Sequence, residues 1–215
     1  MPQINVMFHS VSGNTYRLAQ AIGEGIEEIP TCQVRLLRIP EPAGREPITM
    51  PGLEKRHHEF AHVPEGKIDD LVSCDGLAIG TAVYWGNMSY ATKYFLDSAA
   101  GLWRMPSPQE PVRAPNLSGK PATVFTGGGS GLVHDPAILG LWTVLGSFGM
   151  TIVTIGNGVP EISDPTRTDG GSPLGAGTFS RRPGKHPSEM EISIARAQGR
   201  ALGNLTKAWI THTQS

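Results

Sequence analysis

The chain has 215 residues and a net charge of −1, with 18 lysines and arginines against 19 aspartates and glutamates. This length fits one domain with a sizeable core, and the near-neutral charge offers no basic surface for nucleic acid or an anionic membrane. No apolar run approaches the roughly 20 residues of a membrane-spanning helix, and the start, MPQINVMF, does not resemble a signal peptide, so a cytoplasmic location is expected.

The first half of the chain predicts two strands with a helix between them. Residues 3–9 form a short apolar run typical of a buried strand, and residues 33–39 form another. The intervening helix carries four apolar residues on one face: Leu18, Ile22, Ile26 and Ile29. Residues 40–66 are rich in Pro, Gly and charge and predict a long loop, in which function or variability is expected. A short helical turn is expected near residues 68–71.

The second half continues the alternation of strands and helices. Strands are predicted at residues 75–81, 121–126 and 150–155. One helix is expected from about Met88 to Ala99, and another from the N-cap Asp135 and the following Pro136 to Gly149. A Gly/Pro-rich loop at 156–187 precedes the last helix, which Ser188 and Glu191 begin with a capping box.

This order predicts an α/β fold, because strands that alternate with helices form a parallel sheet covered on both faces. Five such strands fit a flavodoxin-like doubly wound sheet of strand order 2-1-3-4-5. Residues 1–215 are expected to form a single domain, since no linker interrupts them. Ligands of such folds bind at the carboxyl ends of the strands, where the loops after the first, third and fourth strands meet.

The first of these loops, from Ser10 to Thr15, has the composition of a phosphate pocket. Its hydroxyls, one amide and one glycine precede a helix whose N-terminus favours an anion. The chain has neither a dinucleotide-binding G-x-G-x-x-G at this position nor a Walker A sequence. The loop predicts a site for a single phosphate, and an ordinary capped turn is the alternative.

The other two loops supply flat and narrow surfaces. Residues 81–88, Thr-Ala-Val-Tyr-Trp-Gly-Asn-Met, place two aromatic rings beside a Gly-Asn pair and can present them to a flat heterocycle, or bury them in the core. Residues 126–131, Thr-Gly-Gly-Gly-Ser-Gly, allow the backbone to approach a ligand closely, or form a plain flexible loop. Together the three loops predict a flavin mononucleotide (FMN) site.

Motifs spread over nearly the whole chain resemble the WrbA-type NAD(P)H:quinone oxidoreductases, a flavodoxin-like family. They are the Ser-x-x-Gly turn at 10–13, Gly-Asn-Met at 86–88, Phe-Leu-Asp at 95–97, Gly-Leu-Trp at 101–103, Gly-Met at 149–150, Gly-Gly-Ser-Pro at 170–173, Gly-Ala at 175–176, and Pro-Ser at 187–188 leading to Ser-Ile-Ala-Arg at 193–196. The later motifs are absent from short flavodoxins, so they favour this family over simple electron carriers.

The resemblance implies roles for three groups of residues. The FMN phosphate would be held by Ser10, Val11, Ser12, Gly13, Asn14 and Thr15. The flavin ring would be flanked by Val83, Tyr84, Trp85, Gly86 and Asn87. The ribityl chain and ring edge would be walled by Thr126, Gly127, Gly128, Gly129 and Ser130. Trp103 would reach over the flavin of a neighbouring subunit, which implies a homotetramer built as a dimer of dimers.

This chain departs from the family pattern at several positions. Tyr84 stands where the family has an arginine, which removes a positive charge near the ring. Phe148 stands where a pocket-lining histidine is usual, so it is expected to make the substrate pocket more apolar. His134 lies after the glycine-rich loop, and either replaces a lost polar group of the pocket or faces solvent beside a helix cap.

These features lead to the hypothesis of a two-electron flavin-dependent reductase. NADH or NADPH would reduce FMN, and a quinone would then take the place of the nicotinamide, in a ping-pong mechanism. The alternatives are a flavodoxin-type electron carrier, an FMN-dependent nitro- or azo-reductase, and a protein that has lost FMN and acts by binding partners. No metal site is expected: His57, His58 and His62 lie in a loop without nearby cysteines, and Cys32 and Cys74 fit buried, reduced side chains.

Overall fold

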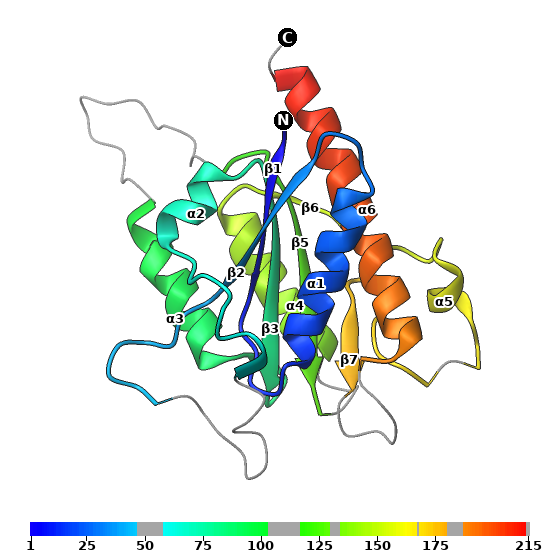
Figure 1. The fold of residues 1–215 in the computed structure, drawn as a ribbon, viewed down its shortest axis with the longest axis horizontal. Coiled ribbons are helices and arrows are strands. Elements are labelled where there is room, and N and C mark those ends of the chain that lie inside the picture. The colour runs from blue at the N-terminus through cyan, green and yellow to red at the C-terminus, as the bar shows by residue number, and fades with distance from the viewer. Residues whose placement is uncertain (47–57, 103–116, 130–133, 167, 180–186, 214–215) are drawn as a thin grey trace.

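The computed structural model describes residues 1–46, 58–102, 117–129, 134–166, 168–179 and 187–213. Strands and helices alternate along these residues (Figure 1). The strands are β1 (Gln3–Phe8), β2 (Gln33–Arg38), β3 (Gly76–Tyr84), β4 (Asn87–Met88), β5 (Pro121–Gly128), β6 (Thr151–Ile152) and β7 (Gly177–Phe179). The helices are α1 (Asn14–Glu27), α2 (Ile68–Ser73), α3 (Tyr90–Ser98), the 3-10 turn η2 (Ala99–Leu102), α4 (His134–Ser147), α5 (Pro160–Ser163) and α6 (Glu189–Thr213).

The central sheet confirms the predicted fold class. Its main strands lie in the order β2-β1-β3-β5-β6 and are parallel, which is the order 2-1-3-4-5 once the short β4 is set aside. Two strands are additions to this plan. β4 pairs antiparallel with the end of β3, and β7 pairs parallel with the end of β5.

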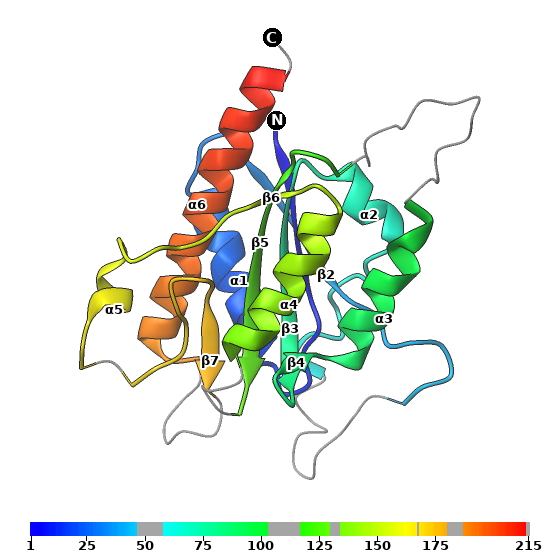
Figure 2. The same cartoon turned by 180° about the vertical axis from the view of Figure 1, so that it is seen from behind.

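Helices cover both faces of the sheet. Helices α1 and α6 lie side by side on one face, and α2, α3 and α4 lie on the other (Figures 1 and 2). Side chains of β1 alternate between the two cores, because successive residues of a strand point to opposite faces. Ile4, Val6 and Phe8 pack with α1 and α6, whereas Met7 joins the core beneath α3 and α4.

The fifth position of the sheet is shared by two strands from different parts of the chain. The predicted strand at 150–155 is shorter than expected, because its ladder beside β5 ends after Val153, whose N–H donates to Ala122 O at 2.7 Å. The Ile155 N–H turns instead to Pro173 O. The far half of β5 then pairs with β7, which lies in the segment expected to be only a loop, as does α5.

Two helix boundaries differ from the predictions, and the predicted start of α6 is confirmed. Helix α1 ends at Glu27, so Ile29 lies outside it, as expected for a residue that precedes a proline. Helix α4 begins at His134, so Asp135 and Pro136 lie inside its first turn, where a proline breaks no helical hydrogen bond. The capping box of α6 is confirmed: the Glu191 N–H donates to Ser188 Oγ at 3.2 Å, and the Ser188 N–H to Glu191 Oε2 at 2.9 Å.

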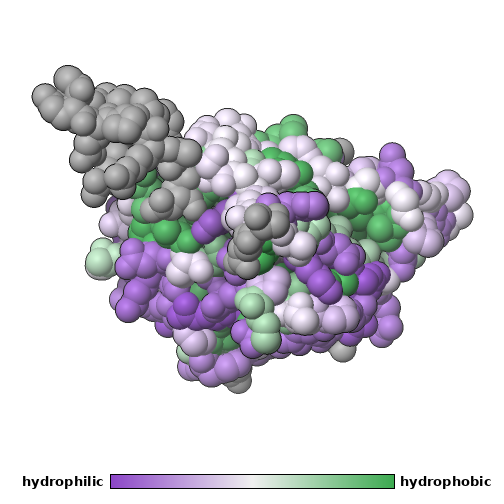
Figure 3. Space-filling view, turned by 90° about the horizontal axis from the view of Figure 1, so that it is seen from above, coloured by the Kyte–Doolittle hydropathy of each residue, from purple (hydrophilic) through white to green (hydrophobic). Residues whose placement is uncertain are grey.

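The two edges of the sheet differ in what they present. The N-terminus and the C-terminal end of α6 lie at the upper edge in Figure 1, and β1, β3 and β5 end at the lower one. The upper edge, seen in Figure 3, mixes hydrophilic residues with small separate apolar patches among the atoms in colour. The loops that follow β1, β3 and β5 therefore meet at the lower edge.

No helix in the described part of the chain is long and apolar enough to cross a membrane.

Candidate active site

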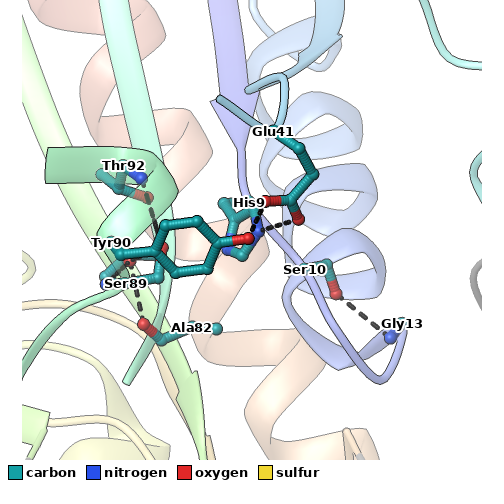
Figure 4. Close-up of polar contacts among 9 residues, drawn as sticks. His9, Ser10, Gly13, Glu41, Ala82, Ser89, Tyr90 and Thr92 are labelled. Carbon is teal, nitrogen blue, oxygen red and sulfur yellow. Dashed lines mark hydrogen bonds and ion pairs between the residues drawn. The ribbon is translucent and has the colours of Figure 1, made fainter. Parts of the chain in front are cut away.

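The first predicted segment, Ser10–Thr15, forms the turn between β1 and α1. Gly13 is the N-cap of α1 with φ 82°, a left-handed conformation that favours glycine. Its N–H donates to Ser10 Oγ at 3.1 Å, which closes the turn (Figure 4). Gly13 has no side chain with which to cap the first turn of α1. The N-terminus of this helix thus keeps the donor character that an anion requires.

An ion pair that sequence reasoning missed borders this turn. Arg17 Nη2 lies 2.6 Å from Glu59 Oε2, and Arg17 Nη1 donates to Asn14 Oδ1 at 3.4 Å. The sequence analysis expected hydroxyls, one amide and one glycine at this pocket and did not include Arg17. The signal available was helical spacing, because Arg17 follows Asn14 by three residues and shares its face of α1.

The second predicted segment is a β-hairpin and not the expected loop after residue 81. Strand β3 continues to Tyr84, and Tyr84 pairs with Asn87 across a two-residue turn. Trp85 and Gly86, the two turn residues, have φ values of 53° and 77°. Positive φ at both positions matches the right-handed twist of a hairpin but is uncommon for a tryptophan. Trp85 is 99 % exposed, so its ring is not a core residue.

Buried hydroxyls fix this hairpin to the helix that follows it. The Ser89 N–H donates to Thr81 Oγ1 at 2.9 Å, and the Thr92 N–H donates to Ser89 Oγ, the N-cap of α3, at 3.3 Å. All three side chains are fully buried. The hairpin therefore projects from a rigid base.

A cluster of three polar side chains, His9, Glu41 and Tyr90, lies between the first two segments. His9 Nε2 lies 2.9 Å from Glu41 Oε1, and the Tyr90 hydroxyl donates to Glu41 Oε2 (Figure 4). Burial and the Glu41 charge raise the pKa of Tyr84 and of Tyr90. Sequence patterns did not indicate this cluster, because Glu41 lies in the long segment between β2 and α2.

Two hollows border the cluster. One of about 170 Å³ is lined by residues that include His9, Ser10, Glu41 and Phe60. The other, of about 550 Å³, is lined by Pro42, Ala43, Arg45, Glu46, Tyr90 and Tyr94. His9 and Glu41 thus line one hollow together with Ser10, and Tyr90 lines the other.

The third predicted segment lies at the end of β5, next to both others. Thr126, Gly127 and Gly128 are strand residues rather than loop residues, while Ser130 lies outside the described residues. A methyl group on Gly127 would come within 2.5 Å of Thr15 Oγ1, and one on Gly128 within 3.1 Å of Val83 Cβ. A Cβ would clash at Gly127 and would be tightly packed at Gly128, so the glycines let the three segments approach one another at one edge.

His134 is buried against the third segment. The alternative that it faces solvent beside a helix cap is therefore wrong. It is 4 % exposed, and its Nδ1 lies 2.7 Å from Thr126 Oγ1. Its ring meets Phe179 edge-on at 4.9 Å, and its Nε2 has no hydrogen-bond partner among the described residues. Burial lowers the pKa of His134 to about 4, so the imidazole is neutral at pH 7.

Of the remaining predicted pocket residues, one lies away from this edge and the other lies outside the described residues. Phe148 follows the end of α4 and packs in the core with Leu145 and Met150, close to the beginning of β5. Helix α4 runs back along the sheet, so it carries Phe148 to the edge opposite the site. Trp103 lies outside the described residues.

Comparison with known proteins identifies the family of this chain. A family model described as NADPH-dependent FMN reductase matches residues 8–158, more than half of the chain. The chain belongs to this family. The match includes the three segments that meet at the edge of the sheet.

Solved structures show the same fold at low sequence identity. A flavodoxin, WrbA-like protein from Agrobacterium tumefaciens is 18% identical, with a TM-score of 0.62 over 97% of this chain and 99% of that one. A flavodoxin from the domain Archaea is 18% identical, with a TM-score of 0.58 over 95% and 99%. RosB with a bound riboflavin phosphate derivative is 12% identical, with a TM-score of 0.64 over 100% and 82%.

The NADPH-dependent FMN reductase family makes this chain a flavin-dependent oxidoreductase with FMN as cofactor and NAD(P)H as electron donor. The residues present fit that cofactor. Gly13 puts no capping side chain over the start of α1, whose N–H groups suit a phosphate, and the close approach of Gly127 to Thr15 and of Gly128 to Val83 brings the third segment against the other two. The electron acceptor is a small molecule.

Proposed function

We propose that this protein is an FMN-dependent NAD(P)H:quinone oxidoreductase that works by a ping-pong mechanism. The observation that carries the proposal is the meeting of the three segments, with Gly127 against Thr15 and Gly128 against Val83. A phosphate-binding turn, a hairpin with an exposed ring and a glycine wall match the parts of FMN. The resemblance to WrbA-type enzymes supports a quinone as the acceptor.

In this proposal each segment holds one part of the cofactor. Residues 10–15 bind the phosphate through backbone N–H groups and hydroxyls, residues 83–87 flank the ring, and residues 126–130 wall the ribityl chain. FMN, when bound, supplies the hydride chemistry that connects NAD(P)H to the acceptor. The protein supplies orientation, because Thr81, Ser89 and Thr92 hold the hairpin from a buried base.

Reduction of a quinone by NAD(P)H consumes one proton besides the hydride. The Tyr90 hydroxyl and His9 Nε2 face the same carboxylate, Glu41, so this cluster holds protons beside the first two segments. His134 is neutral at pH 7 and keeps the third segment in place through Thr126. No nucleophilic side chain is needed, because both substrates react with the cofactor in turn.

We further propose that residues 1–215 act as one domain in a cytoplasmic homotetramer, a dimer of dimers. Trp103 of one subunit would cover the flavin of a neighbour, as the family resemblance implies. A Trp103→Ala variant is then expected to raise the KM for the quinone. An active monomer, or unchanged kinetics in this variant, would refute the shared site.

An anaerobic titration tests the proposed reaction. The FMN-loaded protein is mixed with NADPH or NADH, the flavin absorbance is followed, and benzoquinone is then added. We expect rapid loss of absorbance and full recovery, with parallel double-reciprocal plots in steady state. Bound flavin that NAD(P)H does not reduce would favour an electron carrier, and recovery with nitro or azo compounds but not quinones would change the acceptor class.

A further inference from the structure

A carboxylate of the chain itself lies at the turn proposed to bind the FMN phosphate. Glu59 comes from the segment between β2 and α2, and its Oε2 accepts a hydrogen bond from Arg17 Nη2 at 2.6 Å. A methyl group placed on Gly13 would come within 3.1 Å of the same oxygen. Glu59 therefore brings a negative charge to the N-terminal end of α1, where an anion is favoured.

This position conflicts with a bound phosphate unless Glu59 moves. Two anions a few ångströms apart repel each other strongly near a protein surface, where the effective dielectric constant is well below that of water. The Glu59 side chain is 38 % exposed and the Arg17 side chain 32 % exposed, so the ion pair is open to exchange. Arg17 has a second anchor at Asn14 Oδ1, inside the turn.

The backbone around Glu59 is held more firmly than its side chain. Phe60, the next residue, is buried and packs on Phe8 and Tyr16 with ring centroids 5.9 and 5.7 Å away. The Val63 N–H donates to Phe60 O at 3.0 Å. A rotation of the Glu59 side chain is thus the movement that costs least, and it leaves this segment in place.

We propose that Glu59 is an internal occupant of the phosphate site, which the FMN phosphate displaces, and that Arg17 then pairs with the phosphate in place of Glu59. The inference rests on the proposed binding of the phosphate by residues 10–15. Arg17 becomes a cofactor-binding residue, and Glu59 sets the affinity of the free protein for FMN by competition.

Equilibrium titration of flavin fluorescence with the flavin-free protein tests this exchange. Glu59→Gln keeps the size of the side chain and removes its charge, so FMN should bind about tenfold more tightly. Glu65→Gln is the matched control, because Glu65 lies in the same segment but pairs with Arg38 and not with Arg17. Riboflavin, which lacks the phosphate, should bind equally to wild type and both variants.

A second variant tests the role of Arg17. Arg17→Gln should weaken FMN binding about tenfold and leave riboflavin binding unchanged. Unchanged or weaker FMN binding by Glu59→Gln would overturn the inference, and so would an equal change for riboflavin. Failure of the wild type to bind FMN would instead refute the proposed site itself, so the two failures are distinguishable.

Discussion

Acid should destabilise this protein through His134, and replacing that residue should remove much of the effect. The imidazole is buried between Thr126 and Phe179, and its burial outweighs the nearby charges of Asp135 and Glu191, so its pKa falls to about 4. In the unfolded chain the histidine titrates near its ordinary pKa of 6.5. Below that pH the unfolded state binds a proton that the folded state does not, and stability falls with pH.

The size of the effect follows from the two pKa values. Relative to pH 8, the difference costs about 1.4 kcal/mol at pH 5.5 and about 2.5 kcal/mol at pH 4.5. Most of the loss therefore occurs between about pH 6.5 and pH 4. His134→Asn keeps a polar atom near Thr126, but its side chain cannot bind a proton. The variant should therefore lack the pH-dependent loss of stability that His134 causes.

Urea unfolding of the flavin-free protein at pH 8, 5.5 and 4.5 measures the difference directly. At pH 8 the variant should be less stable than wild type, because it loses the packing on Phe179. The difference in free energy of unfolding between the two proteins should shift by about 2.5 kcal/mol in favour of the variant at pH 4.5. His62→Asn, at an exposed histidine, is the control and should parallel the wild type. Parallel curves for His134→Asn and wild type would refute the buried neutral imidazole.

Two glycine substitutions test the packing of the site and of the fold. Gly127→Ala places a Cβ 2.5 Å from Thr15 Oγ1, so FMN affinity, measured by fluorescence titration, should fall about tenfold or more, and wild-type affinity would contradict the close approach. Gly199→Ala drives a Cβ into Ile22 O where α6 crosses α1, so the free energy of unfolding should fall by about 1–3 kcal/mol in urea. Gly146→Ala, which meets nothing within 4 Å in α4, should change neither quantity by more than about 1 kcal/mol.

Most of the fold was predictable because its signals are local. The apolar runs of the central strands and the Ser188–Glu191 capping box each appear within a few residues of sequence. The hairpin was missed because a tryptophan rarely adopts the left-handed backbone conformation that Trp85 has. Of the two turn residues, only Gly86 is typical of such a turn. Strand β7 was missed because its pairing with β5 links residues about fifty positions apart.

The sequence predicted which three segments form the candidate site, but not every charged residue beside them. The composition of the three segments pointed to one edge of the sheet, and the structure brings them together there. Glu41 and Glu59 were not predictable, because both lie in the long segment after β2, where sequence spacing says nothing about spatial neighbours. The structure places one carboxylate against His9 and the other against Arg17. That segment thus contributes charge to the site, as well as connecting two elements.

The part of the chain beyond the family match also shapes the site. Glu191 is fully buried on α6 and accepts hydrogen bonds from the N–H groups of Gly170 and Phe179, at 2.8 and 3.1 Å. These bonds hold β7 beside the end of β5, and Phe179 then covers His134. The neutral state of His134, and with it the support of the glycine segment, therefore depends on residues that follow position 158. Without them, the end of β5 would lose its pairing with β7, and His134 would lose the cover of Phe179.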